Sequence, residues 1–239
     1  MALYRDQGVI LRTWKLGEAD RIVTILTKGS GKVRAVAKGV RKTKSKFGAR
    51  LEPSSHVQLQ LYGTRGDLDI VTQVETIDRY PGLRTDLDRF GRASAMLEAV
   101  DQLAQEQEVN ERLYEMLVRA LRTLDEVDSP LVAAGFFWKV LSLEGFEPYL
   151  DGCVSCGEDV ALVAFDLDAG GALCASCRRG RALTPEGLEL LRMILGGRLR
   201  DALNLPETAA TAEVDHLAGD AMEHHLERRL RSLGVIGQG

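Results

Sequence analysis

The chain has 239 residues, 45% of them hydrophobic and 28% charged, which is enough to bury a core and excludes disorder along its whole length. Its longest apolar stretch, Val132–Trp138, is far too short to cross a bilayer, and no apolar export signal follows the amino terminus. We therefore expect a cytoplasmic protein with no membrane partner, whose cysteines are reduced and can bind a metal.

The net charge of −4 hides a division along the chain. Residues 1–80 contain 15 Lys and Arg against 8 Asp and Glu, a balance of +7, whereas residues 81–239 contain 16 against 27, a balance of −11. Such an asymmetry predicts two domains with different partners. The basic amino-terminal domain indicates a local nucleic-acid surface.

Residues 1–80 are predicted to form five β-strands separated by turn signals. The clearest is 56–62, where apolar residues alternate with glutamines, as in a strand with one buried face and one wet face. The expected strands are Tyr4–Thr13, Arg21–Thr27, Gly31–Lys38, His56–Tyr62 and Leu68–Ile77. Five strands with one long charged loop between the third and the fourth favour a small closed or nearly closed barrel of the OB-fold type.

From about Asp86 apolar residues recur at steps of three and four, which predicts an α-helical domain over residues 81–239. The domain boundary is expected near Tyr80. Two helix starts carry a capping residue followed by proline, at Ser129-Pro130 and at Thr184-Pro185. Helices are expected to begin near Asp86, Asn110, Ser129, Thr184 and Ala212, the last one reaching Leu233.

The four cysteines form two C-x-x-C pairs with 17 residues between them: Cys153 with Cys156, and Cys174 with Cys177. One such knuckle places two sulfurs on a single ion, and two knuckles complete a tetrahedron. Because four thiolates leave no open ligand position, the expected cofactor is one structural Zn²⁺ per chain and not a catalytic one. We expect a zinc-ribbon-like module at about residues 151–181, inserted in the helical domain. The alternative is four cysteines that serve only for packing.

Five cations lie within nine residues of the loop that follows the third strand. Hydroxyl and amide donors among cations suit phosphate contacts, and an aromatic ring beside them can stack a base of single-stranded nucleic acid. Cations on the preceding strands extend the same surface. The predicted DNA-binding residues are Arg12, Lys32, Arg34, Lys38, Arg41, Lys42, Lys44, Lys46 and Phe47. The alternative is a solvated charged loop without a partner.

No set of side chains predicts catalysis. The segment Gly29-Ser30-Gly31-Lys32 lacks the first glycine and the final Ser or Thr of a phosphate-binding loop, so we interpret it as a hairpin turn and expect no nucleotide cofactor. The protein is therefore expected not to be an enzyme. A zinc-containing enzyme would need an open ligand position, and a thiol-switched chaperone would release zinc on oxidation. A third alternative, an OB-fold RNA-binding factor of translation, differs only in its substrate.

Several segments together resemble the bacterial RecO recombination-mediator proteins by their order and spacing. The resemblance covers residues 16–24, 31–41 and 51–53 of the first domain, and residues 141–146, 183–186 and 225–232 of the second. It implies an N-terminal OB-fold, a helical C-terminal domain and a zinc-ribbon-like insertion. It also implies a protein, nucleoid-associated when bound to DNA, that binds single- and double-stranded DNA and anneals complementary strands. With RecR such proteins help to load RecA onto DNA coated by the single-strand-binding protein, without ATP. Some members have lost the cysteines, whereas this chain keeps all four.

Overall fold

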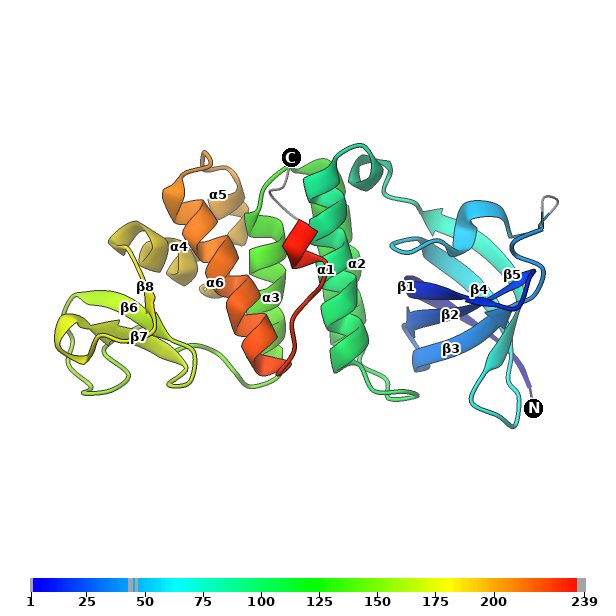
Figure 1. Ribbon diagram of the computed structural model, residues 1–239, viewed down its shortest axis with the longest axis horizontal. Coiled ribbons are helices and arrows are strands. Elements are labelled where there is room, and N and C mark those ends of the chain that lie inside the picture. The colour runs from blue at the N-terminus through cyan, green and yellow to red at the C-terminus, as the bar shows by residue number, and fades with distance from the viewer. Residues whose placement is uncertain (1, 43–44, 46, 236–239) are drawn as a thin grey trace. The chain divides into compact units, whose positions relative to one another are not determined.

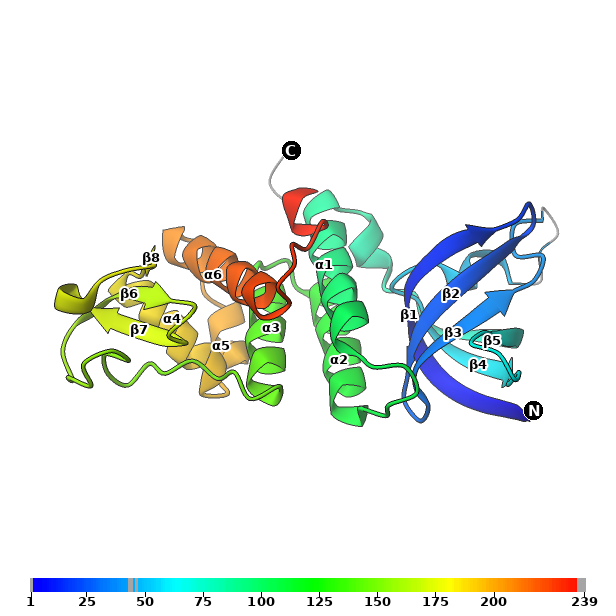
Figure 2. The same cartoon turned by 60° about the horizontal axis from the view of Figure 1, so that its bottom comes forward.

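The structure, a computed structural model, describes residues 2–42, 45 and 47–235. The chain forms two compact units, Met1–Glu126 with Leu230–Gly239, and Val127–Arg229 (Figures 1 and 2). Within the described part of the chain, no helix combines the length and the apolar character that a membrane crossing requires.

The first unit contains the predicted five-stranded barrel, which closes in the order β1-β2-β3-β5-β4 (Figure 1). The strands are β1 (Leu3–Leu16), β2 (Asp20–Thr27), β3 (Gly31–Ala37), β4 (His56–Tyr62) and β5 (Asp69–Asp78). All neighbours are antiparallel except β3 and β5, which pair in parallel. The prediction of an OB-fold barrel is confirmed. Each strand bound lies within three residues of its expected position.

The barrel core is built from one face of each strand. On β3, Val33, Ala35 and Ala37 are buried and alternate with the less buried Lys32 and Arg34. The loop after β3 contains a short 3₁₀ helix, η1 (Gly48–Leu51), whose Leu51 adds to the same core. Alternation on each strand therefore leaves the charged side chains of β3 on the outer surface.

The segment from Gly29 to Lys32 belongs to the predicted hairpin: residues 28–30 make the tight turn between β2 and β3, and Gly31 and Lys32 begin β3. Gly31 there has a φ of +70°, and a Cβ atom on it would lie 2.2 Å from the carbonyl oxygen of Glu108. Only glycine fits this position, because any side chain would collide with the backbone of Glu108.

Two helices complete the first unit. Helix α1 (Leu87–Leu103) is capped by Asp86, whose side chain accepts a hydrogen bond from the amide of Arg89 at 2.8 Å. Helix α2 (Glu111–Glu126) is capped in the same way by Asn110. A 3₁₀ helix, η2 (Pro81–Arg84), precedes α1, and η4 (Leu233–Val235) lies near the end of the chain. The domain boundary expected near Tyr80 stays a prediction, because the first compact unit contains both the barrel and the two helices that follow it.

The second unit packs helices against a small sheet. Helix α3 (Leu131–Leu143) is buried along almost its whole length, which makes it the centre of this core. The other helices are α4 (Pro185–Leu195), α5 (Leu199–Leu203) and α6 (Ala209–His225). The sheet has the order β7-β6-β8, formed by Gly171–Cys174, Leu162–Asp166 and Arg181–Ala182. Trp138 of α3 meets Phe165 of β6 edge to face, with ring centroids 5.8 Å apart, so the sheet is fastened to the helical core.

The last helix is shorter than the sequence predicts. Helix α6 ends at His225 and not near Leu233. The amide of Glu227 donates to the carbonyl of His224 and that of Arg228 to the carbonyl of Glu223, both at 3.1 Å, while Glu227 has a φ of +50°. This pair of bonds is a Schellman motif with glutamate in the place that glycine usually takes, so the sequence carries no signal for it.

Candidate metal centre and nucleic-acid interface

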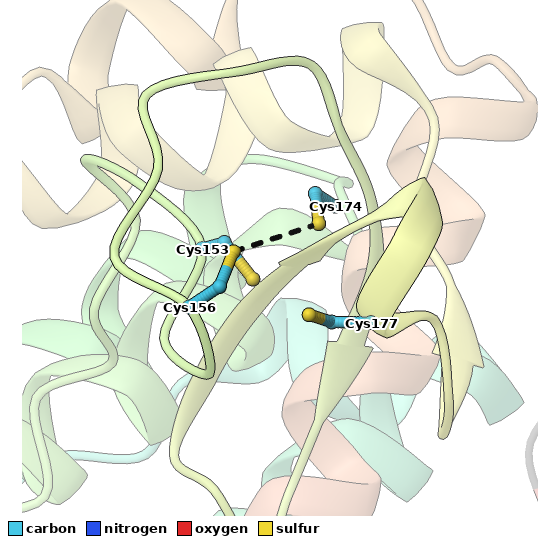
Figure 3. A group of neighbouring side chains, drawn as sticks. All are labelled: Cys153, Cys156, Cys174 and Cys177. Carbon is cyan, nitrogen blue, oxygen red and sulfur yellow. Dashed lines mark hydrogen bonds between the residues drawn. The ribbon is translucent and has the colours of Figure 1, made fainter.

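The four cysteines come together in the second unit. Cys153 and Cys156 lie in the loop before β6, Cys174 ends β7, and Cys177 lies in the 3₁₀ helix η3 (Ala175–Cys177). All four sulfur atoms lie within 4.8 Å of one another. Figure 3 shows them pointing into a common space, two from each C-x-x-C pair. The predicted cluster is confirmed, and four sulfurs at this spacing can hold one metal ion.

Backbone hydrogen bonds shape the first knuckle. The amide of Gly157 donates to the carbonyl of Cys153 at 2.8 Å, and Gly157 has a φ of +77°, which favours glycine. The amide of Val154 donates to the carbonyl of Ala172 on β7 at 2.9 Å, so the knuckle is fixed to the strand that carries Cys174. The C-x-x-C spacing and this glycine together turn both side chains toward the second pair.

The cluster's geometry and its electrostatics both fit a cation. A tetrahedral ion with metal–sulfur bonds of about 2.3 Å sets its sulfurs about 3.8 Å apart, and the sulfurs of Cys156 and Cys174 are 3.9 Å apart. The backbone N–H of Cys174, followed by those of Cys156 and Ser155, lowers the pKa of Cys153 to about 6. The backbone N–H of Glu158 lowers the pKa of Cys156, but the sulfur of Cys153 and burial outweigh it and raise that pKa to about 12. Because neighbouring thiolates repel, four thiolates need a cation among them.

Three of the predicted DNA-binding cations are engaged with acidic residues of their own unit. The Arg12 Nε lies 2.9 Å from a carboxylate oxygen of Asp101, in the last turn of α1. Lys32 donates from its Nζ to the main-chain oxygen of Asp101 at 2.7 Å and lies 3.8 Å from the carboxylate. Arg34 Nη1 lies 3.6 Å from the carboxylate of Glu106. These contacts were not visible in the sequence, because each joins residues far apart in the chain.

Three described cations of the loop after β3 lie at the surface. Lys38, Arg41 and Lys42 are exposed. Two hydrogen bonds hold Arg41 in place. Its backbone N–H donates to the carbonyl of Ala19, and its side-chain Nη1 donates to the carbonyl of Glu18 at 2.9 Å. Arg41 thus fastens the start of the loop to the β1–β2 turn, while Lys38 and Lys42 beside it face solvent. Lys44 and Lys46 lie outside the described residues.

Phe47 does not stand beside these cations. It is only 1% exposed and belongs to the barrel core, so the prediction that its ring stacks on a base is wrong. An apolar ring at the start of η1 gains more by entering the core than by facing water. The aromatic ring that the structure does leave part-exposed among the outer residues of β1 is Trp14. The guanidinium carbon of Arg12 lies 4.3 Å from the centre of that ring. The sequence does carry a signal for this pair: Arg12 and Trp14 are two residues apart on a strand, so both side chains lie on the same face.

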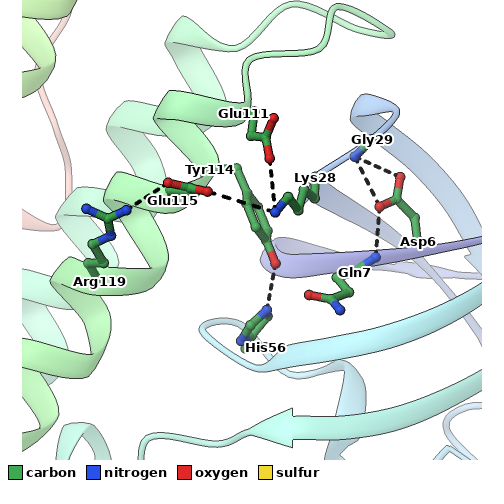
Figure 4. A network of polar contacts seen from close by, with 9 residues as sticks. All are labelled: Asp6, Gln7, Lys28, Gly29, His56, Glu111, Tyr114, Glu115 and Arg119. Atoms are coloured by element: carbon green, nitrogen blue, oxygen red, sulfur yellow. Dashed lines mark hydrogen bonds and ion pairs between the residues drawn. The ribbon is translucent and has the colours of Figure 1, made fainter.

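A polar network joins the barrel to α2 (Figure 4). Lys28 Nζ lies 2.9 Å from Glu111 and 3.8 Å from Glu115, and the ring nitrogen Nε2 of His56 lies 2.7 Å from the hydroxyl of Tyr114. Burial lowers the pKa of His56; the charge of Asp78 opposes this shift and that of Arg122 adds to it. The neutral imidazole is therefore the form that the folded unit prefers.

Comparisons with known proteins agree along the whole chain. The family model described as "Recombination protein O N terminal" matches residues 1–80, and the one described as "Recombination protein O C terminal" matches residues 84–234. The chain is 43% identical to the DNA repair protein RecO of Streptomyces coelicolor and 42% identical to that of Streptomyces griseus, in each case over 99% of both chains. It is also 42% identical, over 99% of both chains, to the DNA repair protein RecO of Frankia casuarinae. The chain belongs to the RecO family of DNA repair proteins.

Proposed function

We propose that this chain is a non-enzymatic recombination mediator that binds single- and double-stranded DNA and anneals complementary strands. With RecR it helps to load RecA onto DNA that the single-strand-binding protein has coated, in the cytoplasm and at the nucleoid when DNA-bound. The observation that carries the DNA-binding role is the set of exposed cations Lys38, Arg41 and Lys42 on an OB-fold barrel, in a chain of the RecO family. Annealing and the protein partners rest on family membership.

The loop cations are the proposed main phosphate contacts. Lys38, Arg41 and Lys42 are exposed, and none of them has an acidic partner among the ion pairs of the described residues, in contrast to Arg12 and Lys32. A cation already paired with a carboxylate must give up that partner before it can neutralise a phosphate. With Lys44 and Lys46 the loop supplies five cations, so log K for single-stranded DNA should fall with log salt at a slope near −3.5, taking roughly 0.7 per contact.

The test is a salt titration of the double variant Lys38→Ala with Lys42→Ala. Loss of two phosphate contacts should flatten the slope by about 1.4. The matched control is Arg119→Ala with Arg198→Ala, which removes the same charge from exposed residues paired with neighbouring carboxylates. An unchanged slope in the loop variant places the DNA site elsewhere. Competition by RNA of the same sequence separates a DNA-binding mediator from an RNA-binding factor.

For annealing, the measurement is the rate at which two complementary dye-labelled strands pair. The wild-type chain should raise this rate, and the loop variant should raise it less, because both strands must be held and their charges screened at one surface. No acceleration by a chain that binds single strands would remove annealing from the proposal and leave DNA binding.

The proposed resident metal is Zn²⁺, one per chain, held by Cys153, Cys156, Cys174 and Cys177. Four thiolates suit zinc in a closed tetrahedral site, where the ion ties the two knuckles together and takes part in no reaction. Elemental analysis of the purified chain should find zinc at a ratio of one. Another metal, or none, at full thermal stability contradicts a structural zinc.

A further inference from the structure

Strand pairing places an apolar row across the outer face of the barrel. Trp14 of β1 is opposite Ile22 of β2, which is opposite Val36 of β3. Their sequence neighbours Val23 and Ala35 belong to the core, so these three side chains lie on the outer side of the sheet. All three are part-exposed. Cross-strand partners on one face are in contact distance of each other, so the row is continuous.

Cations flank this row. The neighbouring register positions hold Arg12 opposite Thr24 and Thr24 opposite Arg34. The side chains of Arg12 and Arg34 are 55% and 33% exposed despite their carboxylate partners. Lys38 directly follows β3 and is exposed. An apolar row that ends beside the exposed Lys38 and the basic loop after β3 fits a chain that carries flat apolar bases on an anionic backbone, which is single-stranded nucleic acid.

Trp14 and Arg12 form a preorganised pair at the edge of the row. The guanidinium group lies over the indole at 4.3 Å, and its Nε is fixed by Asp101, whose carboxylate is only 6% exposed. Because Asp101 fixes the Arg12 side chain, Arg12 loses its rotamer freedom when the chain folds. The corresponding conformational entropy is therefore not lost again when a ligand binds. Asp101 acts through Arg12 and is a positioning residue.

We propose that the Trp14–Arg12 pair is the platform on which a base of single-stranded DNA stacks. The inference rests on the proposed DNA binding and names the contact that bases make there. It assigns to Trp14 the role that the buried Phe47 cannot take. Indole and guanidinium planes both stack on bases without selecting among them, so the platform tolerates any sequence.

The experiment compares two oligonucleotides of equal length and charge, one with bases and one in which every nucleotide is abasic. Trp14→Ala should weaken binding of the normal strand roughly 5- to 150-fold, the loss expected for one stacked base. The same variant should bind the abasic strand as tightly as the wild type does. The salt slope should stay unchanged on both strands, because stacking neutralises no phosphate. Trp14→Phe keeps an aromatic face and should retain most of the affinity. Phe90→Ala, which removes an exposed ring from the first turn of α1, is the matched control.

Fluorescence gives a second measurement that does not depend on affinity. The chain has two tryptophans, and Trp138 is 1% exposed in the helical core. Quenching by a normal single strand should therefore come from Trp14 and vanish in Trp14→Phe. Quenching that survives in this variant overturns the platform, and so does a Trp14→Ala effect of equal size on normal and abasic strands. A wild-type chain that binds neither strand overturns the proposed function instead, so the two failures are distinguishable.

Discussion

Replacing Cys174 by serine should release the metal and unfold the module around it. Cys174 is buried at the end of β7, opposite Leu162 of β6, so its loss opens the sheet as well as the metal site. Phe165 and Leu173 in this sheet are fully buried, and Phe165 packs on Trp138. Each contributes about 1.5–3 kcal/mol by burial, so exposing both lowers the free energy of unfolding of the second unit by about 3–6 kcal/mol. For a unit of about 100 residues this lowers the melting temperature by roughly 12 °C or more.

Three measurements follow the change. Elemental analysis counts the metal, a thermal melt gives the stability, and limited trypsin digestion locates the opened segment. The module offers trypsin Arg179 and Arg181, which in the folded chain are paired with Asp166 and Asp220. Cleavage there should rise in Cys174→Ser and not in the control Ser176→Ala, which changes an exposed neighbour that is not a ligand. If Cys174→Ser keeps its metal and melts with the wild type, the four-sulfur site is not what stabilises this unit.

Two further predictions concern the first unit. Asp101→Asn removes the negative partner of Arg12 and Lys32 and should lower the free energy of unfolding by about 1–3 kcal/mol in urea titrations. Glu106→Gln should lower it by under about 1 kcal/mol, because the Glu106 side chain is 49% exposed. Equal losses in the two variants would contradict the role of Asp101 as a buried anchor. Because the folded pKa of His56 lies below its ordinary value of 6.5, the unfolded chain takes up protons first as the pH falls. The stability that the neutral ring contributes is thus complete above about pH 6.5 and is lost as the pH falls through the folded pKa. Between pH 7.5 and 5.5, the free energy of unfolding of His56→Asn should fall less than that of the wild type. An equal fall would assign the effect to other groups.

The features that the sequence predicted well are those whose cause is local. Alternation along each strand fixes which face is buried, and glycine-rich turns fix where the strands reverse, so the barrel followed from residues 1–80. The cluster of four cysteines followed from C-x-x-C spacing, because each knuckle places its two sulfurs within a few residues. The helix that ends at His225 escaped prediction because Glu227 adopts the left-handed conformation without a glycine to announce it.

The features that the sequence did not predict depend on contacts between distant residues. Counting cations found Arg12 and Lys32 but not Asp101, which neutralises both from the end of α1. Phe47 lies beside a charged loop in sequence, yet its direction depends on whether the barrel core has room for it. The row of Trp14 with its neighbours depends on strand register, which pairing fixes and periodicity alone does not.

The salt dependence of DNA binding measures how the two kinds of cation contribute. If all eight predicted cations neutralised phosphates, the slope for single strands would be about −5.6, whereas the five loop cations alone give about −3.5. The carboxylates of Asp101 and Glu106 hold Arg12, Lys32 and Arg34 in the folded chain, so these three should add little, and the smaller slope is expected. A wild-type slope near −5.6 would mean that phosphate displaces both carboxylates. In that case Glu106→Gln should tighten binding, because the displacement no longer has to be made. If the slope is near −3.5, Glu106→Gln should leave the affinity for single-stranded DNA unchanged. The outer face of β1 to β3 then contributes through the stacking ring of Trp14 and not through the charges of Arg12, Lys32 and Arg34.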